Sequence, residues 1–466
     1  MADPRARGSR PGGRPPARRG ADPSRSAAYD VLKAVRLDDA YTNLVLPHVL
    51  REHGLSGRDA AFTTELVSGT IRRQGTYDAI ITACLDKPKV EAKVLDALRL
   101  GAHQLLSMRV PSHAAISTTV DLVRVKVGQG PAGFTNAVLR KVAVHDLDGW
   151  IRRVAPDPTH DPIGFASIAH SHPRWVVGGM RDALGPEGDL DALLTADNAS
   201  PKVMLVARPG SSTVEELVAA GGTPGRFSPY AVELAGGDPG SIPAVLEGRA
   251  GVQDEGSQLV ALALADAPLG GRDERWLDLC AGPGGKSALL AAVARGRGAK
   301  VLASELQQHR AGLVRRGTQA IPGGMLGVIT ADGTRPPWLP GTFDRVLVDA
   351  PCSGLGALRR RPESRWRRTP ADVKELVPLQ RALLEAALDS VRSGGLVAYA
   401  TCSPLLPETA EVVRAVLDAR PGVELMDATA ALPGVPDAAG PIPGTLQLWP
   451  HVHGTDAMFL ALLRAR

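Results

Sequence analysis

The sequence predicts a multidomain protein: an all-α N-terminal bundle, a small α+β linker region, and a C-terminal α/β domain built on a doubly wound parallel sheet. Three observations carry this prediction. Apolar residues recur at i, i+3, i+4 spacing through the first third of the chain. Strand and helix patterns alternate from about residue 251 onward. A glycine-rich turn links the first of those strands to its helix.

Residues 1–26 are predicted to form a disordered tail rich in Arg, Pro and Gly. The tail holds seven Arg and two Asp, which accounts for the whole formal net charge of +5. The rest of the chain is therefore formally neutral, and its overall charge does not indicate a nucleic-acid partner. A tether for RNA phosphates and a solubilising extension are equally good interpretations of the tail.

Residues 27–150 are predicted to be a helical bundle whose helices are separated by Pro and Gly. The expected helices cover residues 27–35, 43–51, 58–73, 77–85, 90–109, 116–125 and 135–144.

Residues 151–250 are predicted to form a small α+β linker domain. Short helices are expected at 175–184, 189–197 and 214–220, and the alternating pattern at 202–208 is typical of a strand.

Residues 251–466 are predicted to form the α/β domain. Its expected strands are 276–279, 300–304, 325–330, 345–349, 396–401 and 457–463, and its expected helices are 287–295, 308–317, 376–391 and 408–419. In such sheets ligands bind beyond the carboxyl ends of the strands, so residues at those ends are the candidates for function.

The loop at 277–287 follows the first of these strands and opens a helix, and its glycines permit close approach of a ligand. It lacks the spacing of a nucleotide-binding P-loop. The next three strands end in Glu305, Asp332 and Asp349. An acid at the second strand can bind ribose hydroxyls, and one at the third can reach an adenine amino group. This succession favours S-adenosylmethionine as the cofactor.

Two of the four cysteines, Cys352 and Cys402, follow consecutive strands and are flanked by turn-forming residues. Cys84 and Cys280 are interpreted as core residues. A thiolate that adds to carbon 6 of a cytosine makes carbon 5 nucleophilic, so paired thiols beside a methyl donor indicate cytosine methylation. Asp349 is expected near ring N3, where an acid favours the addition.

Four blocks resemble the Sun/Nop family of RNA cytosine-5 methyltransferases. They are residues 253–258 (QDEGSQ), 280–286 (CAGPGGK), 349–354 (DAPCSG) and 400–403 (ATCS). The resemblance implies a Rossmann-like S-adenosylmethionine-dependent methyltransferase domain in which Cys402 is the nucleophile and Cys352 promotes product release. It also implies cofactor contacts from Cys280, Ala281, Gly282, Pro283, Gly284, Gly285, Lys286, Glu305, Asp332 and Asp349.

The chain departs from the family pattern at three places. Gly282 stands where the family usually has Ala, and Glu305 stands where Asp is commoner. Residues 409–411 read Thr-Ala-Glu where the family often has Glu-Asn-Glu.

An arginine-rich segment at 358–368 holds six Arg, one Glu and Trp366. Arg side chains bind phosphates and Trp can stack on an unpaired base, so the segment predicts an RNA contact surface. The predicted contacts are Arg359, Arg360, Arg361, Arg365 and Trp366. Because the target base must reach a thiol in a crevice, single-stranded or flipped RNA is expected.

Blocks at 58–62, 65–72, 98–104 and 135–140 resemble the NusB-type RNA-binding fold, and the block at 447–456 resembles the bacterial branch of the family that modifies 16S ribosomal RNA. The expected substrate is therefore 16S rRNA. An assembly factor without methyl transfer, a methyltransferase for tRNA or other RNA, and a DNA cytosine-5 methyltransferase are the alternatives.

No apolar run approaches the roughly 18 residues of a membrane span, and no secretory signal opens the chain. The scarce, scattered cysteines favour a reducing cytoplasm. His451 and His453 lack further ligands at metal-binding spacing, so no metal is expected. A monomer is expected.

Overall fold

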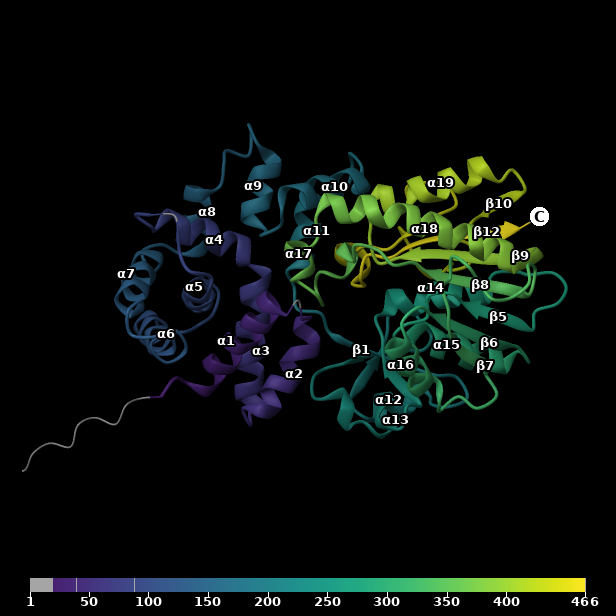
Figure 1. Cartoon of the computed structure of the whole chain (residues 1–466), viewed down its shortest axis with the longest axis horizontal. Coiled ribbons are helices and arrows are strands. Elements are labelled where there is room, and N and C mark those ends of the chain that lie inside the picture. Colours follow the sequence, from purple (N-terminus) through teal and green to yellow (C-terminus); the bar gives the residue numbers. More distant parts are fainter. Residues whose placement is uncertain (1–19, 39, 88, 466) are drawn as a thin grey trace, which may run out of the picture. The chain divides into compact units, whose positions relative to one another are not determined.

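The computed structural model describes residues 20–38, 40–87 and 89–465 (Figure 1). The chain forms two compact units, residues 1–154 and 155–466. Most of the predicted tail, residues 1–19, lies outside the described residues. The first helix begins at Pro23, so the tail boundary predicted at residue 26 is wrong by a few residues. Asp22 caps this helix by accepting from the Arg25 N–H, which explains where it starts.

The first unit is helical throughout, as predicted. Helix α5 lies at its centre and packs against α3, α4, α6 and α7. Gly101 permits the α5–α7 contact, since a Cβ there would meet Leu139 at 2.8 Å. The helices are α1 (Pro23–Leu37), α2 (Thr42–Glu52), α3 (Gly57–Arg72), α4 (Gln74–Ala83), α5 (Ala92–Leu106), α6 (Ser112–Lys126), α7 (Ala132–Val142) and α8 (Leu147–Val154).

The second unit opens with α9 (Pro162–Ala169), α10 (Arg174–Leu184) and α11 (Leu190–Asp197). Val176, Met180 and Leu193 of α10 and α11 pack against Leu355 and Leu358 of the large domain. Helices α10 and α11 therefore pack on the core of the large domain.

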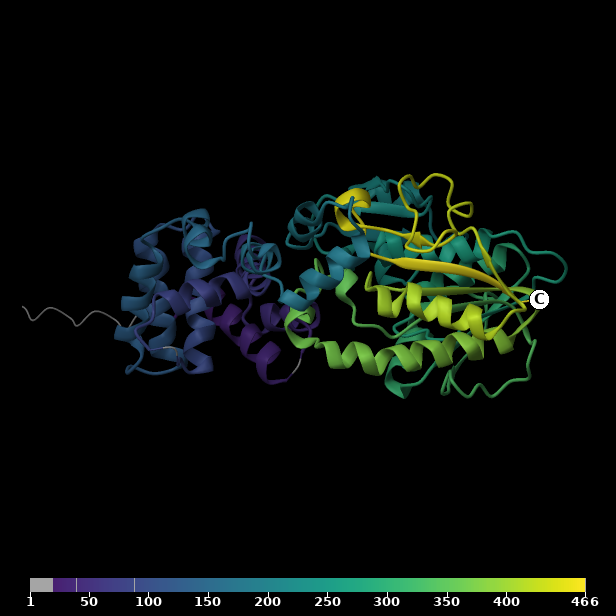
Figure 2. The ribbon, with the colours of Figure 1, turned by 90° about the horizontal axis from the view of Figure 1, so that it is seen from above.

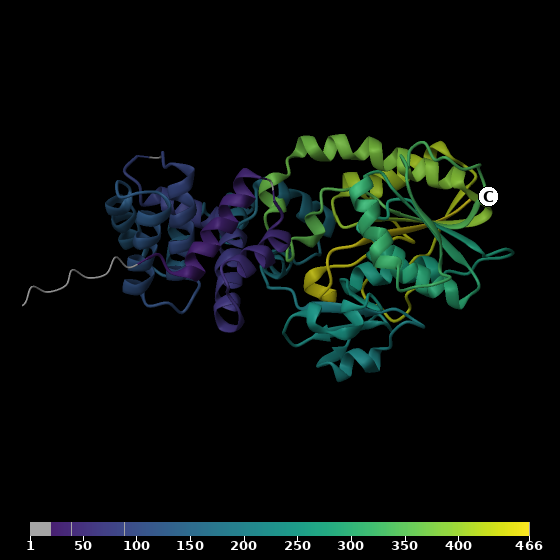
Figure 3. The same ribbon diagram turned by 60° about the horizontal axis from the view of Figure 1, so that its bottom comes forward.

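A small antiparallel sheet of order β2-β3-β1-β4 follows, with helices α12 and α13 beside it (Figure 3). The domain boundary predicted at residue 250 falls inside β4, whose residues pair with β1. The elements are β1 (Val203–Ala207), α12 (Val214–Ala219), β2 (Gly222–Pro224), β3 (Ala231–Leu234), η1 (Pro239–Ser241), α13 (Pro243–Leu246) and β4 (Ala250–Val252).

The large sheet has the order β10-β12-β9-β8-β5-β6-β7, with β11 paired to β12. The five strands from β7 to β9 run parallel, as predicted. The sheet is mixed, however, because β12 pairs antiparallel with both β9 and β10. The strands are β5 (Arg275–Asp278), β6 (Lys300–Glu305), β7 (Met325–Thr330), β8 (Phe343–Asp349), β9 (Val391–Thr401), β10 (Val423–Met426), β11 (Leu446–Gln447) and β12 (Phe459–Ala465).

Helices cover both faces of this sheet (Figures 1 and 2). Trp276 and Leu347 point to the face covered by α14 and α15, whereas Val346 and Val348 point to the face covered by α18. This period-two alternation buries both faces of β8. The helices are α14 (Glu255–Asp266), α15 (Gly285–Gly296), α16 (Gln308–Thr318), η2 (Leu355–Ala357), α17 (Ser364–Arg367), α18 (Pro370–Ser390), η3 (Leu406–Glu408), α19 (Ala410–Ala419) and α20 (Pro450–His453).

None of the helices in the described ranges combines the length and the apolar character that crossing a bilayer requires.

Candidate active site

The two predicted thiols meet at the carboxyl end of the sheet. Cys352 follows β8 and Cys402 follows β9, and these strands are parallel neighbours in which Asp349 pairs with Ala400. Both loops therefore leave the same edge. The Sγ atoms of Cys352 and Cys402 lie 3.4 Å apart, and both thiols are free and partly exposed.

The pKa values of the two thiols are shifted in opposite directions. The hydrogen bond between them lowers the pKa of Cys402; burial and the Asp349 carboxylate oppose this, and Lys286 and Arg361 add smaller lowering effects. The same hydrogen bond, together with burial, raises the pKa of Cys352 well above its ordinary value. The lowered pKa of Cys402 and the raised pKa of Cys352 favour Cys402 as the thiol that ionises first.

The glycine-rich loop joins the same edge through an ion pair. Lys286, in the first turn of α15, places its Nζ 2.8 Å from Asp349 Oδ2 at the end of β8. Burial opposes the charge of Lys286, but the neighbouring Asp349 carboxylate outweighs it and raises the Lys286 pKa. The loop and the strand that leads to Cys352 are therefore held together.

Glu305 supports the loop from the end of β6. Its buried carboxylate accepts hydrogen bonds from Gly282 N at 2.9 Å and from Gln307 N at 3.0 Å. A Cβ at position 282 would lie 2.2 Å from Glu305 Oε2. A side chain at 282 would therefore require the Glu305 carboxylate to move, so we expect the two departures from the family pattern at 282 and 305 to be coupled.

Asp332 follows β7 and is exposed. Hydrogen bonds from the Thr334 hydroxyl at 2.7 Å and amide at 2.9 Å fix one of its oxygens and lower its pKa. The predicted strand-end acids thus all lie on one edge of the sheet.

Polar atoms beneath the loop fit a polar ligand. Within the described residues, Asp278 Oδ1 and Ser304 Oγ are buried without a hydrogen-bond partner. Burial raises the pKa of Asp278 to about 7. Together with Glu305, Asp332 and Asp349, this donor set suits a ligand that carries hydroxyls, amino groups and positive charge, which S-adenosylmethionine does.

The arginine-rich segment differs from its prediction. Arg365 is fully buried and donates to Asn198 Oδ1 at 2.7 Å and to the backbone oxygens of Ser171 and Asp197, both at 3.2 Å. Its predicted contact with RNA is therefore corrected: its hydrogen bonds tie α17 to α9–α11.

Arg359 is also buried, and its predicted RNA contact is corrected too. Arg359 lies 3.4 Å from Asp456, and Arg360 lies 2.6 Å from Asp254 and 3.3 Å from Asp456. These pairs join η2, α14 and the loop before β12. Arg361 is exposed, and Trp366 is half-buried. Three arginines of the segment, Arg359, Arg360 and Arg365, thus bind other residues of the protein.

Sequence reasoning did not single out Glu408, whose buried carboxylate binds the serines that follow both cysteines. The sequence could have indicated its role, because Glu408 lies in an apolar turn six residues after Cys402 and a buried acid needs hydrogen-bond partners.

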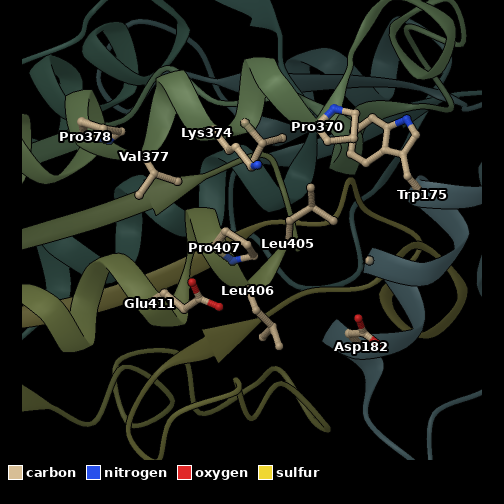
Figure 4. A pocket seen from close by; sticks show the side chains of 12 residues that line it. Trp175, Asp182, Pro370, Lys374, Val377, Pro378, Leu405, Leu406, Pro407 and Glu411 are labelled. Carbon is tan, nitrogen blue, oxygen red and sulfur yellow. The ribbon is translucent and has the colours of Figure 1, made fainter.

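A pocket of about 610 Å³ lies between α10, the start of α18 and the turn after β9 (Figure 4). Trp175, Val373, Val377, Leu405 and Leu406 give it an apolar lining. Neither thiol and no residue of the glycine-rich loop lines it, so we do not assign the chemistry to this pocket.

Known proteins resemble both units. A family model described as 16S rRNA methyltransferase RsmB/F matches residues 267–464, and the NusB family model matches residues 22–144. "Putative methyltransferase Rv1407" of Mycobacterium tuberculosis is 52% identical over 458 residues, covering 97% of this chain and 99% of that protein. The ribosomal RNA small subunit methyltransferase B of Pseudomonas syringae is 33% identical over 450 residues, covering 94% of this chain and 96% of that protein.

Solved structures share the fold. The crystal structure of PH0851 superposes with a TM-score of 0.77 at 22% identity and covers 95% of this chain and 99% of its own. A methyltransferase homologue from Pyrococcus horikoshii has a TM-score of 0.55 at 23% identity, covering 67% of this chain and all of its own.

Proposed function

The chain belongs to the RsmB/F family of S-adenosylmethionine-dependent methyltransferases with an N-terminal NusB domain, and on that premise we propose that it methylates carbon 5 of a cytosine in 16S rRNA. The observation that carries the proposal is the thiol pair. Cys402 and Cys352 lie 3.4 Å apart beside the Lys286–Asp349 ion pair, and only Cys402 has a lowered pKa.

S-adenosylmethionine, when bound, supplies an electrophilic methyl group. The residues assigned to hold it are the loop Cys280–Lys286 with Glu305, Asp332 and Asp349. Glu305 and Asp332 are assigned to hydroxyl and amino groups of the ligand. The buried carboxyl of Asp278 lies beneath the loop and supports this assignment.

Cys402 acts as the nucleophile. Its thiolate adds to carbon 6 of the cytosine, and the ring electrons move to carbon 5, which can then accept a methyl group. The Lys286–Asp349 pair is assigned to the N3 edge, where a donated proton neutralises the developing charge.

Cys352 acts in release. After methylation the carbon 5 proton passes to solvent water, its bonding electrons re-form the double bond, and the bond from carbon 6 to the Cys402 sulfur breaks so that the sulfur departs as a thiolate. The S–H of Cys352, whose Sγ lies 3.4 Å from that of Cys402 in the resting pair, donates a hydrogen bond to the departing thiolate. Release thus restores the starting arrangement of the two thiols.

We assign RNA contacts to the NusB domain and, within the arginine-rich segment, to Arg360, Arg361 and Trp366. Arg361 is near enough to Cys402 to lower its pKa and is exposed, so it suits a phosphate beside the reacting base. We further propose that the protein acts as a monomer in the cytoplasm.

The test is transfer of labelled methyl from S-adenosylmethionine to unmodified 16S rRNA, followed by nucleoside analysis. We expect label in 5-methylcytidine. Label that appears only with tRNA or other RNA would overturn the substrate, and cofactor binding without transfer to any RNA would favour an assembly factor.

A further inference from the structure

Glu408 is a buried carboxylate that no ion pair neutralises within the described residues. It lies in η3, is 0% exposed, and takes part in none of the described salt bridges. Four neutral donors satisfy it instead. Ser353 donates its backbone N–H at 2.7 Å and its hydroxyl at 2.5 Å, Ser403 donates its hydroxyl at 2.6 Å, and Gln380 donates its amide at 3.1 Å. Holding a bare charge in this way is costly unless every lone pair is used.

These donors connect Glu408 to both thiols. Ser353 directly follows Cys352, and Ser403 directly follows Cys402. The two serine hydroxyls also lie 3.1 Å apart. One carboxylate is therefore the common acceptor for the two loops, whose Sγ atoms lie 3.4 Å apart. Catalytic groups need positions held within about 0.5 Å, which hydrogen bonds of this kind provide.

The charge of Glu408 also favours one of the two thiols as the proton carrier. Its negative charge is among the causes that raise the pKa of Cys352, after the hydrogen bond to Cys402 and burial. The cations Lys286 and Arg361 act on the other thiol, where they lower the pKa of Cys402 and are opposed by Asp349. The Glu408 carboxylate is thus among the causes that raise the pKa of Cys352, whereas cations act only on Cys402 among the causes given for the two thiols.

We propose that Glu408 is a positioning residue that fastens the two cysteine loops together and keeps the shared proton on Cys352, so that Cys402 alone is the nucleophile. The proposal deepens the two-thiol mechanism and rests on the proposed function for its catalytic meaning.

Glu408→Gln removes the charge while it keeps the side chain's size and one acceptor oxygen. The first measurement is alkylation of the purified full-length protein by iodoacetamide near neutral pH, with the Cys402 and Cys352 peptides quantified by mass spectrometry. Wild type should react mainly at Cys402. In the variant the ratio of Cys402 to Cys352 modification should fall, because a negative charge that raises the pKa of Cys352 is gone.

The second measurement is methyl transfer. The kcat of Glu408→Gln should fall while the KM for RNA and the affinity for S-adenosylmethionine stay near wild type, because Glu408 contacts neither. Glu411→Gln is the matched control: Glu411 is exposed and lies one turn further along the chain, so its substitution should change neither kcat nor the alkylation ratio.

A folded Glu408→Gln protein with the wild-type ratio and kcat would overturn the proposal. If that variant does not fold, Ser403→Ala decides instead, since it removes one donor and keeps the charge. Its kcat should fall while Cys402 remains the preferred site of alkylation, and an unchanged kcat would contradict the fastening role. The alkylation ratio needs no RNA, so it tests this inference even if wild type proves unable to methylate RNA.

Discussion

A methyl group added at position 282 should disrupt the cofactor site through Glu305. In Gly282→Ala the new Cβ would lie 2.2 Å from Glu305 Oε2 and 2.8 Å from Arg310 Nε. The carboxylate must then move, although both its oxygens are bonded to backbone N–H groups in the wild type. The substitution therefore breaks the hydrogen bond from residue 282 to Glu305.

The expected loss follows from that bond. A hydrogen bond to a charged group contributes about 1.5–3 kcal/mol. Because 1.4 kcal/mol is a factor of ten, the Kd for S-adenosylmethionine should rise about 10- to 100-fold. The assay is isothermal titration of the purified protein, and a melting curve verifies that the variant is folded.

The coupling between the two positions can be tested by rescue. Glu305→Asp withdraws the carboxylate by one methylene and vacates the space that the Cβ needs. The double variant Gly282→Ala/Glu305→Asp should therefore bind more tightly than Gly282→Ala alone, with a coupling energy of about 1–3 kcal/mol. If the binding free-energy changes of the two single variants add up to that of the double variant within about 0.5 kcal/mol, the reasoning is refuted, because independent positions behave in that way.

Three further predictions concern other parts of the second unit. Cys402→Ala should abolish methyl transfer with little change in the Kd for S-adenosylmethionine; retention of most activity would contradict its assignment as nucleophile. Burial raises the pKa of Asp197 to about 7, above its value in the unfolded chain, so its protonated form stabilises the fold at low pH and this contribution is lost as pH rises towards 7. Asp197→Asn should flatten that part of the melting temperature–pH curve, and an identical slope in the variant would be evidence against the shift. Arg365→Ala should lower Tm because it leaves buried acceptors unpaired. Arg361→Ala, at an exposed position, should lower Tm less than Arg365→Ala and should weaken RNA binding with a smaller salt dependence; the reverse pattern would contradict our assignment of the arginine-rich segment.

Hydrophobic periodicity predicted most of the helices of the first unit and the parallel strands of the large sheet, but it missed helix α14 and strands β2, β3 and β4. The strand predicted at 325–330 is β7, and the helices predicted at 58–73 and 308–317 agree with α3 and α16 to within a residue. The mixed character of the sheet was missed because β12, which lies inside the sheet and is mostly buried, has the same apolar composition as its parallel neighbours. β10 escaped notice because its four residues are only half-buried and show no alternation.

The site was predictable where its chemistry depends on residue type and strand position, as for Cys352 and Cys402. The site was not predictable where a long side chain forms hydrogen bonds with residues that are far away in the sequence. Arg365 donates to the carbonyl oxygen of Ser171, which lies 194 positions away in the sequence. No pattern in the neighbouring sequence distinguishes Arg365 from the exposed Arg361. Glu408 was missed for the same reason, because its partner Ser353 lies 55 positions earlier.

The central claim is that Cys402 forms the covalent bond to RNA and Cys352 assists its release. The most direct measurement incubates Cys352→Ala with S-adenosylmethionine and unmodified 16S rRNA, separates the products on a denaturing gel, and maps the cross-linked peptide by mass spectrometry. We expect a shifted protein–RNA band whose RNA is attached to Cys402, and no such band in the Cys352→Ala/Cys402→Ala double variant. A Cys352→Ala protein that methylates rRNA at the wild-type rate without an adduct, or an adduct on another residue, would contradict the account.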